Sequence, residues 1–172
     1  MNYPQDTYLY KTTRVTNTWI KTDKIENFSP ITQVYGIIFN NKREILICRE
    51  SKDGSWQIPG GHPEKSESIE ETLKRELLEE VDVEIENIEP LGVQKVTFPD
   101  DPDKEKAIYQ VRCIAKLKKL NFQTPDPANG NTWERKFVPS DKITEYVKWG
   151  KTGKAVFRDA IKCIFQANLL LK

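Results

Sequence analysis

The chain has 172 residues, of which 27 are Lys or Arg and 26 are Asp or Glu, giving a formal net charge of +1 at pH 7. This balance gives no general electrostatic footprint for duplex nucleic acid, although it is compatible with a locally basic substrate groove. The length suits one substantial core rather than two. No apolar run approaches the length of a membrane span, and the N-terminus lacks the charged and apolar regions of a signal peptide. We therefore expect a cytoplasmic protein that binds neither membranes nor duplex nucleic acid.

The N-terminal segment is polar and contains only short apolar alternations, such as the one around Trp19. Alternation over so few residues favours an edge strand or an extended arm over a helix. We therefore predict an N-terminal arm or edge strand over residues 1–30, followed by the main domain over residues 31–172.

Two β-rich runs come next, at residues 33–39 and 44–49. The residues between them are polar and rich in Asn, which is typical of a hairpin turn. A further polar turn at residues 51–55 leads to a short segment that ends in the adjacent glycines Gly60 and Gly61. Glycines at this point leave room for a backbone carbonyl to turn toward a metal ion.

An acidic helix is predicted from about Ser68 to Val81. Ser68 can cap its first turn, and Glu71 can reach back to the Ser68 backbone, which is the reciprocal arrangement of a capping box. At about 100° per residue, four apolar side chains form one stripe along the helix: Ile69, Leu73, Leu77 and Val81. The helix is therefore expected to place this stripe against the core.

Three carboxylates crowd the boundary of that stripe, with Glu76 and Glu80 at its edge and Glu79 just outside it. Glu76 and Glu80 repel each other across one helical turn, and partial burial raises the cost of their charges. Arg75 offsets only part of this charge. One interpretation is a site for a hard cation, Mg²⁺ or Mn²⁺, because all the ligands are oxygens. The other is a solvated acidic face without a ligand.

After this helix, residues 88–98 and 107–117 alternate as two strands, and residues 133–138 form another. The last segment, residues 154–171, is predicted to be a core-facing helix. Its apolar side chains at helical spacing are Phe157, Ile161, Ile164 and Phe165. Strands and helices without regular βαβ alternation predict an α/β (α+β) fold, in which a mixed sheet packs between helices.

The cysteines Cys48, Cys113 and Cys163 are odd in number, far apart and set among apolar residues. This pattern predicts buried free thiols in a reducing compartment. A catalytic cysteine is not indicated, because His62 is the one histidine that could act as its base and nothing in the sequence connects the two.

The segment from Gly61 to Val83 resembles the Nudix box, in which glutamates, an arginine and apolar residues follow a glycine at fixed spacing. The matching positions are Gly61, Glu67, Arg75, Glu76, Leu77, Glu79, Glu80 and Val83. One position departs from the pattern, because Asp82 stands where the box has a glycine. This residue follows the helix, where a left-handed conformation caps the last turn, and Asp tolerates that conformation.

The resemblance covers roughly residues 32–171 and implies the α/β/α sandwich of Nudix hydrolases. It also implies a divalent-metal-dependent hydrolase, with Mg²⁺ or Mn²⁺ as cofactor. Such an enzyme cleaves a phosphoanhydride bond in a nucleoside diphosphate linked to another moiety, a small nucleotide-type substrate. Family members are frequently dimers, so a homodimer is a further expectation.

The resemblance assigns the metal ligands to the glycine pair and the acidic helix. The Gly60 carbonyl, Glu76 and Glu80 would bind the metal directly. Glu79 would be either a further ligand or the base that orients the attacking water. With one to three cations neutralising phosphate charge, these side chains would mainly hold the metals in place.

Arg75 and Glu67 would brace the glycine loop against the helix. Nudix hydrolases also often use an acidic residue outside the box, at a position that varies. Glu134, Asp126 and Glu105 are candidates for this catalytic role, and Glu134 is the first choice. A glutamate on a surface strand is more commonly just solvated, which is the competing interpretation.

Substrate contacts outside the box are predicted from residue type. Arg49 and Arg112 are candidates for gripping a phosphate, and Trp56 for stacking on a base. His62, beside the glycines, is a candidate for contacting a substrate phosphate. Core packing is the competing interpretation for the tryptophan, and simple exposure for the histidine.

A catalytically weak nucleotide- or RNA-binding Nudix module is the alternative function. Loss of a box carboxylate would favour this alternative, and none is lost. An RNA 5′-end pyrophosphohydrolase is a third hypothesis, to which the neutral charge balance gives no positive support.

Overall fold

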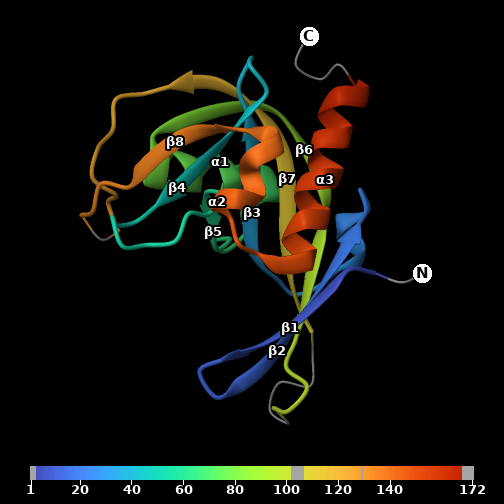
Figure 1. Cartoon of the computed structure of the whole chain (residues 1–172). Coiled ribbons are helices and arrows are strands. Elements are labelled where there is room, and N and C mark those ends of the chain that lie inside the picture. Colours follow the sequence, from blue (N-terminus) through green and yellow to red (C-terminus); the bar gives the residue numbers. More distant parts are fainter. Residues whose placement is uncertain (1–2, 102–106, 129, 168–172) are drawn as a thin grey trace.

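The computed structural model of the chain describes residues 3–101, 107–128 and 130–167, and its strands form a curled sheet (Figure 1). The described strands are β1 (Gln5–Tyr10), β2 (Thr13–Lys21), β3 (Ile31–Phe39), β4 (Glu44–Arg49), β5 (Gly60–Gly61), β6 (Val83–Thr97), β7 (Ile108–Leu120) and β8 (Glu134–Pro139). The described helices are α1 (Ile69–Val81), α2 (Ile143–Tyr146) and α3 (Gly150–Ala167), with 3₁₀ turns η1 (Ile25–Asn27) and η3 (Ser140–Lys142).

The sheet is mixed, as predicted. Its strand order is β1-β2-β6-β7-β3-β4-β8, and the short β5 pairs with β3. Strands β3 and β7 run parallel, whereas β6 and β7 run antiparallel. The predicted hairpin is confirmed, because β3 and β4 pair antiparallel through Phe39 and Ile45.

Helices cover both faces of this sheet. Successive side chains of a strand point to opposite faces, and β4 is buried on both: Ile45 and Ile47 contact the cluster around α3, while Leu46 contacts the cluster around α1. The stripe on α1 packs as predicted, with Leu73 and Leu77 fully buried. This confirms the α/β/α sandwich.

The N-terminal segment joins the sheet as a hairpin of β1 and β2. Strand β1 lies at the sheet edge, and β2 lies between β1 and β6. Trp19 on β2 is 1% exposed, and its Nε1 donates to the Asp159 carboxylate of α3 at 2.9 Å. The hairpin therefore packs into the same core as the residues that follow it. The domain boundary between residues 30 and 31 stays a prediction.

Two elements begin four or five residues before their predicted starts. Strand β6 begins at Val83, directly after α1, instead of at residue 88. Register irregularities around residues 86–89 interrupt the strand pairing. The first part of β6 therefore lacks the period-two alternation by which a strand is predicted from sequence. Helix α3 begins at Gly150 instead of residue 154. The predicted end of this helix at residue 171 lies outside the described residues.

The prediction that Phe165 faces the core is wrong. Phe165 is 51% exposed, and the Arg43 guanidinium lies 4.4 Å from its ring centroid. The neighbouring Ile164 is buried with Phe157, and the next residue along a helix points about 100° away.

Within the described residues, no helix combines the length and hydropathy that crossing a bilayer requires.

The thiols of Cys48 and Cys113 are buried, whereas Cys163 is partly exposed. Burial raises the pKa of Cys113 to about 12 and, with the nearby Glu80 charge, raises the pKa of Cys48. At about pH 8, only ~10⁻⁴ of the Cys113 thiol is ionised.

We expect iodoacetamide to modify Cys163 alone in the native protein and all three thiols after unfolding, as counted by mass spectrometry. Labelling of Cys48 or Cys113 as fast as Cys163 would contradict the packed interior.

Candidate active site

Helix α1 begins and ends as its sequence predicts. The Ser68 hydroxyl accepts from the Glu71 backbone N–H at 3.2 Å, and the Glu71 carboxylate accepts from the Ser68 N–H at 2.8 Å. At the other end Asp82 is left-handed, with φ 51° and ψ 47°, and its N–H donates to the carbonyls of Leu77 and Leu78. The capping box and the left-handed cap are confirmed.

Asp82 also fastens a loop, which a glycine at this position would not do. Its carboxylate accepts from the backbone N–H and from the hydroxyl of Thr124, both at 2.8 Å. Arg135 on β8 adds a second fastening by donating to the carbonyls of Val81, Asp82 and Asn121. The end of α1 is thereby tied to the segment that leads to Asp126.

Arg75 is the centre of the acidic cluster. Its Nε donates to the Glu67 carboxylate at 2.7 Å, and its Nη1 donates to Glu76 and Glu79, each at 3.0 Å. Its Nη2 donates to the His62 carbonyl at 2.9 Å and again to Glu67 at 3.0 Å. One guanidinium thus connects the loop after the glycines to two of the box carboxylates.

The two glycines bring the backbone of β5 against α1. The Gly60 N–H donates to the Glu80 carboxylate at 3.0 Å. A Cβ atom on Gly60 would collide with the backbone of Val34 and Tyr35, and Gly60 has a φ of +139°, which favours glycine. A Cβ atom on Gly61 would collide with the Glu76 carboxylate. A side chain at Gly60 would therefore push β5 away from β3, and one at Gly61 would push the loop away from the acidic helix.

Burial and neighbouring charges disfavour ionisation of the inner carboxylates. Burial raises the pKa of Glu80 to about 8, against the hydrogen bond from Gly60, and the negative charges of Glu76, Asp126 and Glu79 raise it further. Burial also raises the pKa of Glu76, with Arg75 opposing the shift. A cation bound beside these groups would remove this penalty.

The donor atoms at this place suit a hard divalent cation. Glu76, Glu79 and Glu80 offer only oxygens, the ligands that Mg²⁺ and Mn²⁺ prefer, whereas Gly60 presents its N–H to Glu80. In this structure the three carboxylates bond to Arg75 or to the Gly60 N–H instead. Accordingly, no three His, Cys, Asp or Glu side chains of the described residues are spaced as ligands of one ion. A cation would take the place of some of these internal partners.

Glu134 and Arg49, two predicted site residues, pair with each other. The Glu134 carboxylate accepts from Nε and Nη2 of Arg49, at 2.9 and 2.6 Å. The Arg49 guanidinium also donates to the Lys52 carbonyl and lies 4.5 Å from the Trp56 ring centroid. Lys136 covers the same ring at 4.2 Å. All three guanidinium nitrogens of Arg49 therefore have hydrogen-bond partners. The cationic groups of Arg49 and Lys136 both lie against the Trp56 ring.

Asp126 is the candidate outside the box whose negative charge contributes to raising the pKa of Glu80. It is 6% exposed and accepts from Trp133 Nε1 at 3.0 Å and from the Ala128 N–H at 2.8 Å. Glu105 lies outside the described residues. The assignment of a catalytic acidic residue outside the box stays a prediction, and this geometry favours Asp126 over Glu134.

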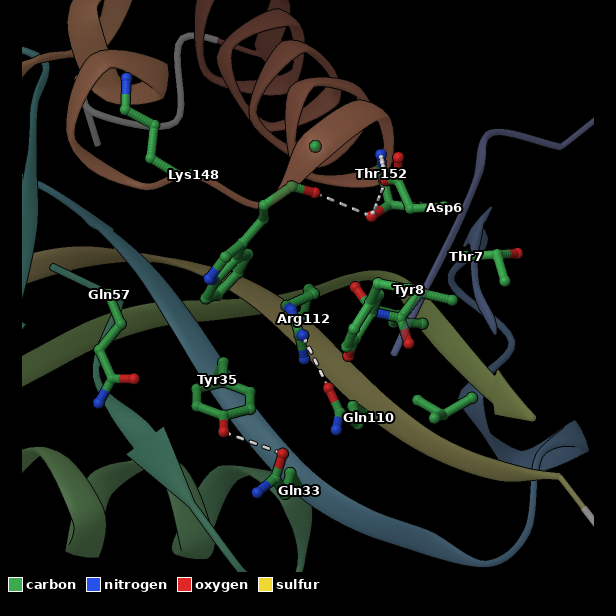
Figure 2. A pocket seen from close by; sticks show the side chains of 15 residues that line it. Asp6, Thr7, Tyr8, Gln33, Tyr35, Gln57, Gln110, Arg112, Lys148 and Thr152 are labelled. Atoms are coloured by element: carbon green, nitrogen blue, oxygen red, sulfur yellow. Dashed lines mark hydrogen bonds between the residues drawn. The ribbon is translucent and has the colours of Figure 1, made fainter. Parts of the chain in front are cut away.

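A polar cavity of about 550 Å³ lies on the α3 face of the sheet, and Arg112 is among the side chains that line it (Figure 2). Its other walls come from β1, β2, β3 and β6 and from the first residues of α3. Sequence analysis missed Tyr35 and Trp149, whose rings flank Arg112 at 4.5 and 5.2 Å. Both are apolar enough to be interpreted as core, and only the fold reveals the cavity beside them.

The cavity borders the glycine pair. Tyr35 on β3 pairs directly with Gly60, and Gln57, which also lines the cavity, precedes Gly60 by three residues. The charges of Glu76 and Glu80 contribute to raising the pKa of the Tyr35 hydroxyl, although burial is the larger cause. The acidic cluster and the cavity therefore both lie close to the Tyr35–Gly60 pair.

A family model described as the NUDIX domain matches residues 30–159. The RNA pyrophosphohydrolase of Haemophilus influenzae is 36% identical over 151 residues, covering 78% of this chain and 76% of that protein. The RNA pyrophosphohydrolase of Ruthia magnifica subsp. Calyptogena magnifica is 26% identical over 144 residues, or 74% and 77% of the two chains. The 8-oxo-dGDP phosphatase of Danio rerio is 42% identical over 65 residues, which are 36% of this chain and 20% of that protein.

Solved structures share the fold. The Bacillus subtilis pyrophosphohydrolase has a TM-score of 0.64 at 20% identity, covering 91% of this chain and 96% of that one. The MutT protein from Bacillus halodurans has a TM-score of 0.56 at 23% identity, covering 73% and 78%. At these identities the likeness establishes the arrangement of strands and helices alone.

The contact between Arg75 and Glu67 predicts a pH dependence of stability. The Arg75 hydrogen bond, followed by the Glu64 N–H, lowers the pKa of Glu67 from 4.5 to about 2. A carboxyl with a lowered pKa stabilises the fold above its unfolded pKa, and this contribution is lost as the pH falls through 4.5 toward about 2. We expect Glu67→Gln to lower the urea midpoint at about pH 6 and to flatten its decline between about pH 5 and pH 2.

The matched control is Glu70→Gln on the exposed side of the same helix, where Glu70 pairs with Lys74. It should leave the pH dependence of the urea midpoint close to that of the wild type. Parallel pH profiles for wild type and Glu67→Gln would show that the Arg75 contact does not stabilise the fold.

Proposed function

The chain belongs to the Nudix hydrolase family, and from that premise we propose that it is a divalent-metal-dependent pyrophosphohydrolase. Its substrate is a nucleoside diphosphate linked to another moiety, cleaved at the phosphoanhydride bond. The observation that carries this proposal is the acidic cluster on one side of α1: Glu80 accepts from the Gly60 N–H, and Arg75 donates to Glu76 and Glu79.

The chain's own groups divide the work of such a reaction. Glu76 and Glu80, together with the Gly60 backbone, would hold Mg²⁺ or Mn²⁺. When bound, the cation neutralises charge on the phosphate oxygens and helps to deliver an attacking water. Glu79 is more solvent-accessible than Glu76, at 38% against 14%, so it is placed to accept a proton from that water. Arg75 fixes the orientation of Glu79 through their hydrogen bond.

Arg75 and Glu67 act as positioning residues in this scheme. Together they hold the loop between the glycines and α1 on the helix, through the Glu67 carboxylate and the His62 carbonyl. A shift of about 1 Å in such a loop is enough to reduce a rate by ~100-fold. The bracing therefore supports catalysis without touching the substrate.

An RNA 5′-end pyrophosphohydrolase is the second candidate within this reaction class. It is favoured by the two RNA pyrophosphohydrolases whose matches extend over about three quarters of both chains. Chemically the two candidates are close, because the 5′ end of a primary transcript is a nucleoside triphosphate whose 3′ oxygen carries the chain. A catalytically weak binding module remains the alternative, and the intact acidic cluster argues against it.

Hydrolysis of a substrate panel with Mg²⁺ or Mn²⁺ tests the proposal. The panel contains nucleoside triphosphates, ADP-ribose, a dinucleoside polyphosphate, a nucleotide sugar, NADH and a 5′-triphosphorylated RNA. We expect hydrolysis of at least one, with release of phosphate or a nucleoside monophosphate. Glu80→Gln should lower kcat by more than the ~10- to 100-fold typical of losing an outer-sphere partner of a metal site, because it removes a ligand.

Glu70→Gln is the matched control, since it removes one carboxylate from the exposed side of the same helix. Its kcat should stay within about twofold of the wild type, because surface substitutions away from a site change little. Full activity of a folded Glu80→Gln variant, or no hydrolysis of any substrate by the wild type, would refute the assignment.

A further inference from the structure

Asp82 is the residue at which the box segment departs from the family pattern, and its side chain makes contacts that a glycine lacks. One carboxylate oxygen accepts from the Thr124 backbone N–H and the other from the Thr124 hydroxyl, each at 2.8 Å. The Asp82 carbonyl also accepts from the Asn121 N–H at 3.0 Å. The residue that ends α1 therefore attaches the segment after β7 at two points.

Arg135 on β8 holds the same junction from another side. Its Nη1 donates to the carbonyls of Val81 and Asp82, and its Nη2 donates to the carbonyl of Asn121. The last carbonyls of a helix have no partner within the helix, so a guanidinium is a suitable donor for them. The end of α1, the start of the segment and β8 are thereby connected through one side chain.

The chain between Thr124 and Asp126 is short and stiff. Pro125 lies between these two residues, and Pro127 follows Asp126. A proline fixes its own φ and restricts the residue before it to extended conformations. The Cα atoms of Thr124 and Asp126 are separated by at most about 7 Å, the span of two residues. The position of Thr124 therefore determines, within narrow limits, where Asp126 lies.

Asp126 is also held from its far side, against the core beside α1. Its backbone N–H donates to the Asn131 carbonyl at 2.8 Å, and its carboxylate accepts from Trp133 Nε1 at 3.0 Å. Trp133 belongs to the same buried cluster as Leu77 and Val81 of α1. These contacts place Asp126 next to the half of the helix that carries the acidic cluster.

The Asp126 carboxylate keeps both its charge and part of its acceptor capacity. Its two hydrogen-bond donors, the Ala128 N–H and Trp133 Nε1, are neutral. An ionised carboxylate has about four acceptor positions, so these two bonds fill roughly half of them. The Asp126 charge contributes to raising the pKa of Glu80, which shows that the two carboxylates interact. A cation at Glu80 would relieve this repulsion.

We propose that Asp82 is a positioning residue: by fastening Thr124 to the end of α1, it holds Asp126 beside Glu80 as a further carboxylate for the divalent cation. The inference rests on the proposed function, which supplies the cation. A glycine adopts the left-handed conformation of Asp82 but offers no acceptor to Thr124. The departure from the box therefore adds a task to this position.

A double-mutant cycle on Mn²⁺ affinity tests this inference without a substrate. Calorimetry with Mn²⁺ compares the full-length wild type, Asp82→Gly, Asp126→Asn and the double variant. We expect Asp82→Gly to weaken binding by roughly 10-fold and Asp126→Asn by ~10- to 100-fold, the range typical of partners around a metal site. The double variant should bind no more weakly than Asp126→Asn, because Asp82 acts through Asp126 and coupled residues are not additive.

Asp82→Gly installs the residue of the family pattern and retains the left-handed cap, so α1 should stay folded. The matched control is Asn87→Gly, because Asn87 is exposed and has nearly the same φ, 53° against 51°. It should bind Mn²⁺ as the wild type does. Asp82→Asn retains an oxygen acceptor and should bind Mn²⁺ more tightly than Asp82→Gly. Thr124→Val, which removes one of the two bonds from the other partner, should weaken binding in the same direction.

Kinetics give a second readout on any substrate that the wild type hydrolyses. Asp82→Gly should lower kcat by ~10-fold or more, as expected for a residue that orients a metal site. KM should stay within about twofold, because Asp82 is not assigned to substrate binding. Asn87→Gly should leave both constants unchanged.

Equal Mn²⁺ affinity of the wild type and Asp82→Gly would overturn the inference, even if the thermal unfolding midpoint falls, since Asp82 would then only stabilise the fold. Additive losses in the cycle, or no Mn²⁺ binding by the wild type, would overturn it as well. Failure of the proposed function gives a different result. Coupled losses of Mn²⁺ affinity in a protein that hydrolyses no substrate would retain the positioning role and remove the catalytic assignment.

Discussion

The hydrogen bonds of Arg75 are the contacts on which the site depends. A single guanidinium, with its side chain 23% exposed, reaches Glu67, Glu76 and Glu79 and also the His62 carbonyl. It therefore does two things at once: it fixes the glycine loop on α1, and it offsets part of the negative charge along that helix. Since one cation faces several carboxylates, the remaining negative charge favours the binding of a second cation.

The rest of the fold arranges a second feature, the polar cavity, beside that charge. The acidic cluster lies beside β5, and the polar cavity lies on the α3 face, yet Tyr35 and Gly60 are paired neighbours in the same sheet. Two contacts join helix α3 to the N-terminal hairpin: the Thr152 N–H donates to Asp6, and Trp19 Nε1 donates to Asp159. The acidic cluster and the polar cavity are therefore built by different elements around one sheet.

The sequence was sufficient for features that depend on local chemistry. The capping box of Ser68 and Glu71, the left-handed Asp82 and the mixed sheet were all predicted, because each follows from neighbouring residues or from periodicity. Features that depend on contacts between distant parts of the chain were not predicted. Arg112 and Asn17 meet one cavity from strands that are far apart in the chain, and the irregular β6 conceals its own alternation. The partner of Arg49 is likewise invisible until β4 and β8 pair.

Direct titration with the cation tests the central claim, that the carboxylates of α1 form a divalent-metal site. Calorimetry with Mn²⁺ and Mg²⁺, in the absence of nucleotide, should show saturable binding to the wild type. The double variant Glu76→Gln/Glu80→Gln should bind at least ~100-fold more weakly while remaining folded, because two oxygen ligands with formal charge are lost. Equal affinity of the two proteins for both ions would contradict the account.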